Sequence, residues 1–400
     1  MALFAWLHAR DIMMGLFEDA PAWMDDELVM FDDSVRRFIA DKLPPERLDQ
    51  WREEGIVPRA AWEEMAEAGL LGISIDPDYG GAGGDFRHEA VLIRHLGLAG
   101  AEGFGVPLLN AICAPYIDKY GTEDQKRRWL PKLASGEFIA AIAMTEPGAG
   151  SDLQGIRTTA MRNGNGYLLN GQKTFITNGQ HADLIIVVAK TDPGGGSRGI
   201  SLFGVEVDGL DGFERGRNLD KIGLEMGDTS ELFFDDVALP ADALIGGEEG
   251  QGMYQLMKEL PKERLIIALE CLAMIESAMD VTLDYVRDRK VFGKSVLDYQ
   301  NTQFRLAEHK TEAVIARVFV NDCMERYLAG NLDAATASMA KYWLSERAQN
   351  IVDGCQQFFG GYGYMNEYPI ARMYKDVRVK RVYGGTTEVM KLLIARTLEA

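Results

Sequence analysis

Cysteine and histidine are scarce in this sequence. Its four cysteines lie far apart, with no C-x-x-C pair, and only five histidines accompany them. A structural zinc site needs such residues at close spacing, so we predict no metal site. The cysteines (Cys113, Cys271, Cys323 and Cys355) are better interpreted as reduced thiols of the core. Reduced thiols are typical of an intracellular protein, and we expect the cytoplasm of a bacterium, or the mitochondrial matrix in a eukaryote.

Long apolar runs and an excess of positive charge are also lacking. No apolar run approaches the ~20 residues that span a bilayer, so we predict no membrane span. The net charge of -19 argues against non-specific binding to nucleic acid, whose phosphates would be repelled. An anionic substrate is not excluded, because a local cluster of Lys and Arg can bind phosphate on an acidic protein. Residues 1–24 lack the basic start of a signal peptide, and we expect an N-terminal arm there.

The chain has 400 residues, which is more than one hydrophobic core usually organises. Its sequence pattern divides it into three regions. Residues 25–137 repeat apolar positions at helical spacing. Residues 138–250 alternate short apolar runs with Asn and Gly turns, which predicts an antiparallel β-barrel or sandwich. Residues 251–400 contain long glycine-free segments with apolar stripes, which predict a bundle of long antiparallel helices. The predicted class is therefore α+β, with helical, β and helical domains in that order.

Two motifs lie in the predicted β region. In Ala143-Met-Thr-Glu-Pro-Gly-Ala-Gly-Ser-Asp152, the glycines let backbone amides approach a ligand. Its Thr145 and Ser151 offer hydroxyls to polar ring edges or phosphates. In Gly171-Gln-Lys-Thr-Phe-Ile-Thr-Asn-Gly179, strand alternation puts Phe175 and Thr177 on one face. The alternative interpretation of the second motif is a β-hairpin with an Asn-Gly turn, which is compatible with a binding role.

Three further motifs lie in the last region. The first is Arg287-Asp-Arg-Lys-Val-Phe-Gly-Lys294, followed by Gln300, and the second is Gln357-Phe-Phe-Gly-Gly-Tyr-Gly-Tyr364. Arginine pairs with pyrophosphate through its fork of donors, and glycines permit close backbone approach. The third is Val382-Tyr-Gly-Gly-Thr-Thr-Glu388.

The order of the regions and motifs resembles the acyl-CoA dehydrogenase family over nearly the whole chain from about residue 25. The long-chain branch is the most similar, and isovaleryl-CoA dehydrogenases are more distant. The resemblance implies an FAD-dependent enzyme that oxidises a fatty acyl-CoA thioester to the trans-2-enoyl-CoA. It further implies a homotetramer, arranged as a dimer of dimers, and electron-transferring flavoprotein as the acceptor.

The resemblance also assigns site residues. Phe175 would pack by the flavin and Thr177 would bond flavin N5, whereas Arg289, Phe292 and Gln300 would reach a neighbouring subunit's FAD. The full set of cofactor-binding positions is Met144, Thr145, Ser151, Phe175, Thr177, Arg289, Phe292, Gln300, Gln357, Gly360, Gly361, Thr386 and Glu388. The substrate-binding positions are Ser151, Arg264 (for the CoA phosphates), Tyr383 and Gly384.

The catalytic base requires a separate argument. Many family members carry it directly after the tyrosine of the last motif, where this chain has Gly384. The long-chain and isovaleryl branches place it on an earlier helix, and the matching stretch Lys258–Leu265 identifies Glu263. Glu263 follows Pro261 by two residues, which predicts a position in the first turn of a new helix or just past a kink. A helix start would favour the ionised carboxylate and an apolar pocket would raise its pKa. The backbone N–H of Gly384 and a ribityl hydroxyl of FAD would hold the thioester carbonyl.

Other readings of the sequence stay open. Within the same fold, a flavin oxidase or a dehydrogenase of acyl-carrier-protein thioesters is an alternative. From another class, a catalytically silent flavoprotein could act as an assembly partner, although the presence of Glu263 disfavours it. The length and branching of the acyl chain are not determined, since one bulky side chain such as Phe104 or Met144 could change the depth of the pocket.

Overall fold

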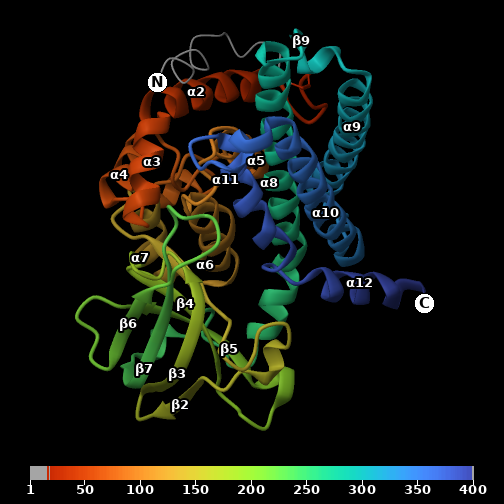
Figure 1. The fold of residues 1–400 in the computed structure, drawn as a ribbon. Coiled ribbons are helices and arrows are strands. Elements are labelled where there is room, and N and C mark those ends of the chain that lie inside the picture. Colours follow the sequence, from red (N-terminus) through yellow and green to blue (C-terminus); the bar gives the residue numbers. More distant parts are fainter. Residues whose placement is uncertain (1–15, 18, 399–400) are drawn as a thin grey trace.

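The computed structural model describes residues 16, 17 and 19–398 (Figure 1). Most of the expected arm at residues 1–24 therefore lies outside the described residues. Three regions follow one another: helices, a curled β-sheet and a bundle of long helices. The predicted α+β class and its order of domains are confirmed.

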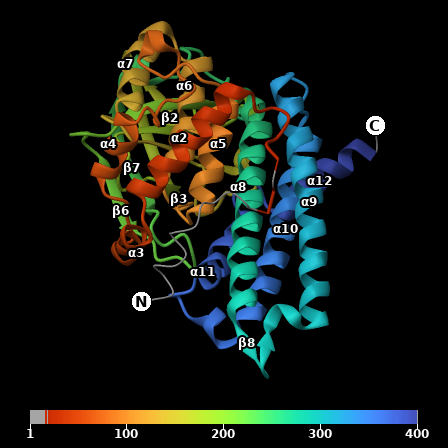
Figure 2. The ribbon, with the colours of Figure 1, turned by 90° about the horizontal axis from the view of Figure 1, so that it is seen from above.

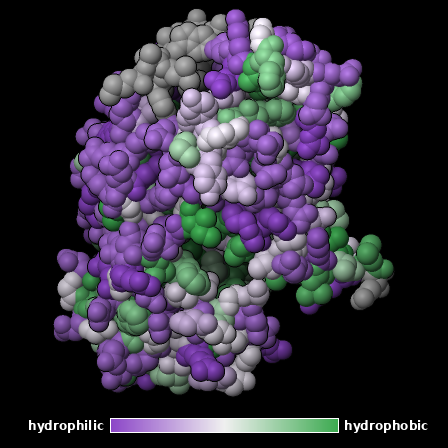
Figure 3. Space-filling view, in the orientation of Figure 1, coloured by the Kyte–Doolittle hydropathy of each residue, from purple (hydrophilic) through white to green (hydrophobic). Residues whose placement is uncertain are grey.

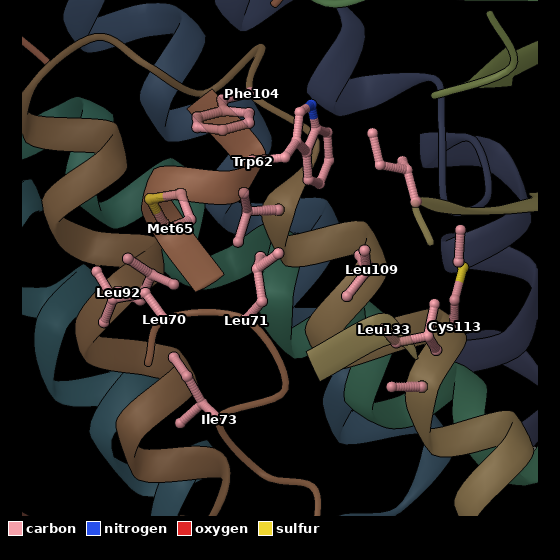
Figure 4. Packing of buried hydrophobic residues seen from close by; sticks show 14 of the residues in the cluster. Trp62, Met65, Leu70, Leu71, Ile73, Leu92, Phe104, Leu109, Cys113 and Leu133 are labelled. Atoms are coloured by element: carbon pink, nitrogen blue, oxygen red, sulfur yellow. The ribbon is translucent and has the colours of Figure 1, made fainter. Parts of the chain in front are cut away.

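The first region begins where Asp25 caps a helix by accepting a hydrogen bond from the backbone N–H of Leu28. The helices of this region are α2 (Asp26–Lys42), α3 (Pro45–Glu54), α4 (Arg59–Glu67), α5 (Phe86–Leu98), α6 (Ala114–Tyr120) and α7 (Glu123–Ala134). A π-helical segment, η2 (Leu108–Cys113), leads directly into α6. The core of the region gathers around Trp62 and Phe104, whose rings meet edge to face with centroids 4.9 Å apart (Figure 4).

The second region is a seven-stranded sheet. Its strands are β1 (Ala140–Ala143), β2 (Thr159–Asn163), β3 (Gly166–Thr177), β4 (Leu184–Lys190), β5 (Ile200–Glu206), β6 (Phe213–Asn218) and β7 (Thr229–Leu239). They lie in the order β1-β4-β2-β3-β7-β6, with β5 also paired to β4. Most pairs are antiparallel, as expected, but β1 and β2 each pair with β4 in parallel. Parallel pairing needs a long connection rather than a hairpin, and the first motif lies in the connection between β1 and β2.

The third region contains α8 (Gly252–Asp288), the hairpin β8 (Lys290–Val291) and β9 (Lys294–Ser295), α9 (Gln300–Leu328), α10 (Ala334–Phe359), α11 (Pro369–Asp376) and α12 (Thr387–Ala395). The 37-residue α8 continues through Pro261, so no new helix starts there. The residues after Pro261 are almost all buried, and this packing stabilises the helix across a residue that would break an isolated one. Glu263 therefore lies inside a helix, two residues past the proline.

Helix α8 links the regions. One end lies beside the β domain and the other carries the β8–β9 hairpin, with α9 and α10 alongside (Figures 1 and 2). The surface between the β domain and the helices has a hollow with hydrophobic residues at its rim (Figure 3). Within residues 16–17 and 19–398, no helix is long and apolar enough to cross a membrane. In the same part of the chain, no group of His, Cys, Asp and Glu side chains could hold a metal ion.

Candidate active site

Glu263 lies in the middle of the buried face of α8, with 6% of its surface exposed. The hydroxyl of Tyr116, on α6, donates a hydrogen bond to its Oε1 across 2.9 Å. Burial raises the pKa of the Glu263 carboxyl, and the Tyr116 hydrogen bond and the nearby Lys262 offset this only in part. Burial therefore outweighs the groups that favour the ionised carboxylate, and Glu263 is not a solvated surface residue.

The segment 383–385 passes over α8 one turn beyond Glu263. Gly384 has φ +62°, a left-handed conformation that favours glycine. A Cβ placed there would lie 2.3 Å from Cδ1 of Ile267, which is four residues after Glu263 and so on the same helix face. The structure thus brings Gly384 and Glu263 to one place, as the sequence predicts.

Three partly buried hydrogen bonds fix this segment on the two sides of Gly384. The hydroxyl of Tyr383 donates to Oε2 of Glu270 across 2.7 Å, and Lys380 donates to the same oxygen across 2.7 Å. On the other side, the ammonium of Lys341 donates to the backbone carbonyl of Gly385 across 2.6 Å. The backbone N–H of Gly384 is consequently held in one orientation beside α8.

A second group of predicted residues lies at the edge of the β domain. The backbone N–H of Thr174 bonds the carbonyl of Thr145 across 2.9 Å, which joins the first motif to the strand of the second. Phe175 and Thr177 are both exposed on one face of β3. Phe175 has φ +59° at a β-bulge and leaves 68% of its surface exposed. Met144 is half-buried and Ser151 is exposed in the same connection.

A third group lies where α8 ends. A cavity of about 410 Å³ is lined by Arg289, Gln357, Gly360 and Gly361, among others. Nothing lies within 4 Å of the position of a Cβ on either glycine, so the backbone there is open to a ligand. The tip of the adjoining β8–β9 hairpin is Phe292, whose ring is 100% exposed. Gln300 is exposed at the start of α9.

The third group is distant from Glu263 within one chain. The 26 positions from 263 to 289 follow α8, and at about 1.5 Å per residue they span about 39 Å. This separation is longer than an extended dinucleotide. One bound dinucleotide therefore cannot contact both Glu263 and Arg289 of the same chain.

Family models match all three regions. The N-terminal domain of acyl-CoA dehydrogenases matches residues 25–137, the middle domain residues 141–237 and the C-terminal domain residues 250–399. The chain belongs to the acyl-CoA dehydrogenase family. This is a family of oxidoreductases that act on CH–CH bonds, and the resemblance found in the motifs is confirmed.

The similar proteins agree with the predicted branch. The chain is 48% identical over 371 residues to a long-chain specific acyl-CoA dehydrogenase of Rattus norvegicus, covering 92% of this chain and 86% of the relative. It is 35% identical over 388 residues to an isovaleryl-CoA dehydrogenase of Pongo abelii, covering 96% and 91%.

Solved structures show the same fold. An acyl-CoA dehydrogenase of Geobacillus kaustophilus superposes with a TM-score of 0.93 at 47% identity, covering 95% of this chain and all of that one. A glutaryl-CoA dehydrogenase of Mycobacterium smegmatis in complex with FADH2 superposes with a TM-score of 0.87 at 31% identity, covering 94% and 95%.

The structure does not favour every predicted contact. Arg264 is 4% exposed and donates to the hydroxyl of Ser338 across 3.2 Å, so its burial argues against a contact with CoA phosphates. Phe104 is fully buried between Trp51 and Trp62 and cannot set the depth of a substrate channel.

The two predicted residues of α12 lie at its start. Thr386 caps the helix by accepting from the N–H of Val389, and Glu388 is exposed in its first turn.

Several residues that shape the site were not predicted. Tyr116 had no motif around it, because its role depends on where α6 packs against α8. Glu146 and Lys173 lie inside the two β motifs and form a buried ion pair, with Nζ and Oε1 2.8 Å apart. No signal in the sequence could have identified this pair, because polar residues flank Lys173, Thr145 and Pro147 flank Glu146, and no spacing rule links the two charges.

Proposed function

We propose that the protein is an FAD-dependent dehydrogenase of fatty acyl-CoA thioesters, with Glu263 as the base that removes the α-proton. The observation that carries the proposal is that Gly384 passes over Ile267, one helical turn from the buried carboxyl of Glu263, in a segment fixed by the bond from Lys341 to Gly385. Membership of the acyl-CoA dehydrogenase family supports the reaction class. The long-chain relatives support a fatty acyl substrate.

The residues present fit FAD. Phe175 and Phe292 expose most of their ring surface, which is unfavourable in water unless a flat apolar partner covers it. Open backbone at Gly360 and Gly361 lies beside the guanidinium of Arg289, as a pyrophosphate requires. We assign Met144, Thr145, Ser151, Phe175 and Thr177 to the flavin side, with Thr386 and Glu388 nearby.

A neighbouring subunit would supply the other contacts. Arg289 lies about 39 Å from Glu263, measured along α8. We assign the contacts of the neighbouring subunit to Arg289 and to the residues grouped with it at that end of the molecule, namely Phe292, Gln300, Gln357, Gly360 and Gly361. We therefore infer a homo-oligomer, and the family resemblance favours a tetramer. The same resemblance favours electron-transferring flavoprotein as acceptor.

The chain's own residues have two tasks in the reaction. The backbone N–H of Gly384 donates to the thioester carbonyl, which stabilises the negative charge that develops there when the α-proton leaves. Tyr383 and the carbonyl of Gly385 hold this donor in place through Glu270 and Lys341. Glu263 accepts the α-proton, and its burial keeps water from competing for it. FAD, when bound, supplies the acceptor for the β-hydride.

The test is anaerobic reduction of the flavin. FAD-loaded protein is mixed with saturated CoA thioesters from C4 to long-chain, straight and branched, and the loss of flavin absorbance is followed. We expect rapid bleaching by one class of thioester. Glu263→Gln should keep its FAD and lose about 10²- to 10⁴-fold in the rate of bleaching, the range for a general base.

Two outcomes would overturn the proposal. Bleaching of Glu263→Gln at the wild-type rate would refute the assignment of the base. Absence of bleaching by every CoA ester would point to a carrier-protein thioester or to a silent flavoprotein, and the same panel on acyl carrier protein would separate these two.

A further inference from the structure

Two tyrosine–glutamate pairs join α6 to α8, one turn apart. Tyr116 donates to Oε1 of Glu263 across 2.9 Å, and Tyr120 donates to Oε1 of Glu259 across 2.8 Å. The tyrosines are four residues apart on one helix and the glutamates four apart, in reverse order, on the other. The helices therefore run antiparallel here, and both hydroxyls point across the same interface.

The two glutamates differ in their other partners. Glu259 also binds two ammonium groups, with Lys119 at 2.8 Å and Lys262 at 3.4 Å. Although burial raises the pKa of Glu259, these cations lower it more, so this carboxylate is a neutralised structural group.

Glu263 forms no such ion pair with any residue in the described part of the chain. Among the residues that the structure describes, Tyr116 is the only side chain that hydrogen-bonds the Glu263 carboxyl. The second oxygen, Oε2, accepts no hydrogen bond from a described residue. It also is not fully shielded from solvent. One oxygen of Glu263 is thus held and the other is open.

We propose that Tyr116 is a positioning residue for proton abstraction: its hydroxyl fixes Oε1 of Glu263 so that Oε2 faces the substrate α-carbon. This inference rests on the function proposed above. In the step, the Cα–H bond breaks, the proton passes to Oε2, and its electron pair stays on the substrate towards the carbonyl. The hydroxyl of Tyr116 keeps its own proton throughout, because it only donates to the other oxygen.

The geometry explains why a tyrosine suits this place. A lysine at this distance would neutralise the carboxylate and weaken it as a base, as Lys119 and Lys262 do for Glu259. A neutral O–H donor orients the carboxylate with less loss of basicity. Tyr116 is also fully buried, so its ring has no freedom to swing away.

The experiment compares Tyr116→Phe with Tyr120→Phe, which removes the equivalent hydroxyl one turn away without touching Glu263. The readout is the rate constant of anaerobic flavin reduction across the acid side of the pH profile, with the thioester that bleaches the wild type. The charged and titratable groups facing Glu263 are Cys113 on η2 and Glu259, Lys262 and Arg264 on α8. Neither substitution removes any of them.

For Tyr116→Phe we expect a rate constant about three- to tenfold lower, the effect of one hydrogen bond. The acid limb of its profile should move to higher pH, because the lost donor favoured the ionised carboxylate. Tyr120→Phe should stay within about twofold of wild type with an unmoved limb. FAD content should be unchanged in both, because neither hydroxyl lies in the groups assigned to the cofactor.

A second substitution keeps the test decisive if Tyr116→Phe folds poorly. Site-specific fluorotyrosine at position 116 is a stronger donor of nearly the same size, and it should move the acid limb to lower pH. A limb that moves in neither variant, or equal slowing by Tyr116→Phe and Tyr120→Phe, would overturn the positioning role. Failure of the proposed function would look different, since wild-type protein itself would then not be bleached.

Discussion

Nζ of Lys173 lies 2.8 Å from Oε1 of Glu146, and both side chains are enclosed by the β domain. The same carboxylate accepts the backbone N–H groups of Arg157 and Thr158, and the lysine also donates to the carbonyl of Met144. One ion pair therefore ties the connection after β1 to strand β3, and so fixes the two motifs assigned to the flavin relative to each other.

Breaking this pair from one side should destabilise the protein. Glu146→Gln leaves the Lys173 ammonium buried without a counter-charge, and we expect a loss of about 3–5 kcal/mol in the free energy of unfolding, measured with urea. The double variant Glu146→Gln/Lys173→Met should recover a large part of that loss. As a control, Glu308→Gln removes an exposed partner of Arg305 and should change stability by less than about 1 kcal/mol. An equal small effect of Glu146→Gln would show that the buried pair is not needed.

Glu263 should lower the stability of the protein at neutral pH. The pKa of the Glu263 carboxyl is higher in the folded protein than its value of about 4.5 in the unfolded chain. Between these two pKa values the folded protein holds a proton that the unfolded chain has released. The free energy of unfolding therefore falls as the pH rises through this range. Glu263→Gln removes this dependence, and its amide oxygen can still accept from Tyr116. We expect it to be more stable than wild type by about 0.5–2 kcal/mol at neutral pH. The difference should vanish near pH 4, and a Gln variant that is less stable at neutral pH would contradict the argument.

Phe104 should matter for stability and not for substrate choice. Its ring fills the space between Trp51 and Trp62, with centroids 5.7 and 4.9 Å away. Phe104→Ala should cost about 3–5 kcal/mol in unfolding free energy and leave the preferred acyl chain length unchanged in the thioester panel. Met161→Ala, at a position that is 44% exposed, is the control and should change stability by less than about 1 kcal/mol. A shift in chain-length preference for Phe104→Ala would restore the channel interpretation.

Mixed oligomers should reveal whether two subunits build one site. Glu263→Gln and Arg289→Ala protein are unfolded together and refolded, and flavin reduction is measured. We expect each site to take Glu263 and Phe175 from one subunit and Arg289 from its neighbour. In a mixed pair, one of the two sites then carries both substitutions and the other carries neither. Activity should therefore reappear in the mixture. Glu263→Gln refolded with Thr177→Ala should restore nothing, since both defects fall on the same side of the interface. Equal recovery in both mixtures, or in neither, would refute the shared site.

The sequence predicts the fold well because each region has its own periodicity and because the motifs occur in order. Glu263, Gly384 and Phe175 could be placed because each lies in a run of recognisable residues. Tyr116 and the Lys173–Glu146 pair could not, since their contacts join segments far apart in the chain, and only packing decides which side chains meet.

Two features also differ from what was expected of them. Of the two alternatives that Pro261 offered, a new helix start is wrong, because the buried residues that follow it continue α8 as one helix. The family resemblance assigned Arg264 to the CoA phosphates, whereas the structure buries this side chain against Ser338 of α10.

The contact between Gly384 and Ile267 bears on how such enzymes diverge. Any side chain added at position 384 would meet Cδ1 of Ile267 and would have to tolerate a positive φ. A chain of this kind cannot transfer its base to that position in one mutational step. An ancestor that acquired a glutamate there while keeping Glu263 would hold two carboxylates in one small apolar space, each suppressing the ionisation of the other. One that lost Glu263 first would have no base at all. Moving the base to position 384 therefore requires the end of the Ile267 side chain to shift and the new residue to adopt a left-handed backbone, in addition to the loss of Glu263.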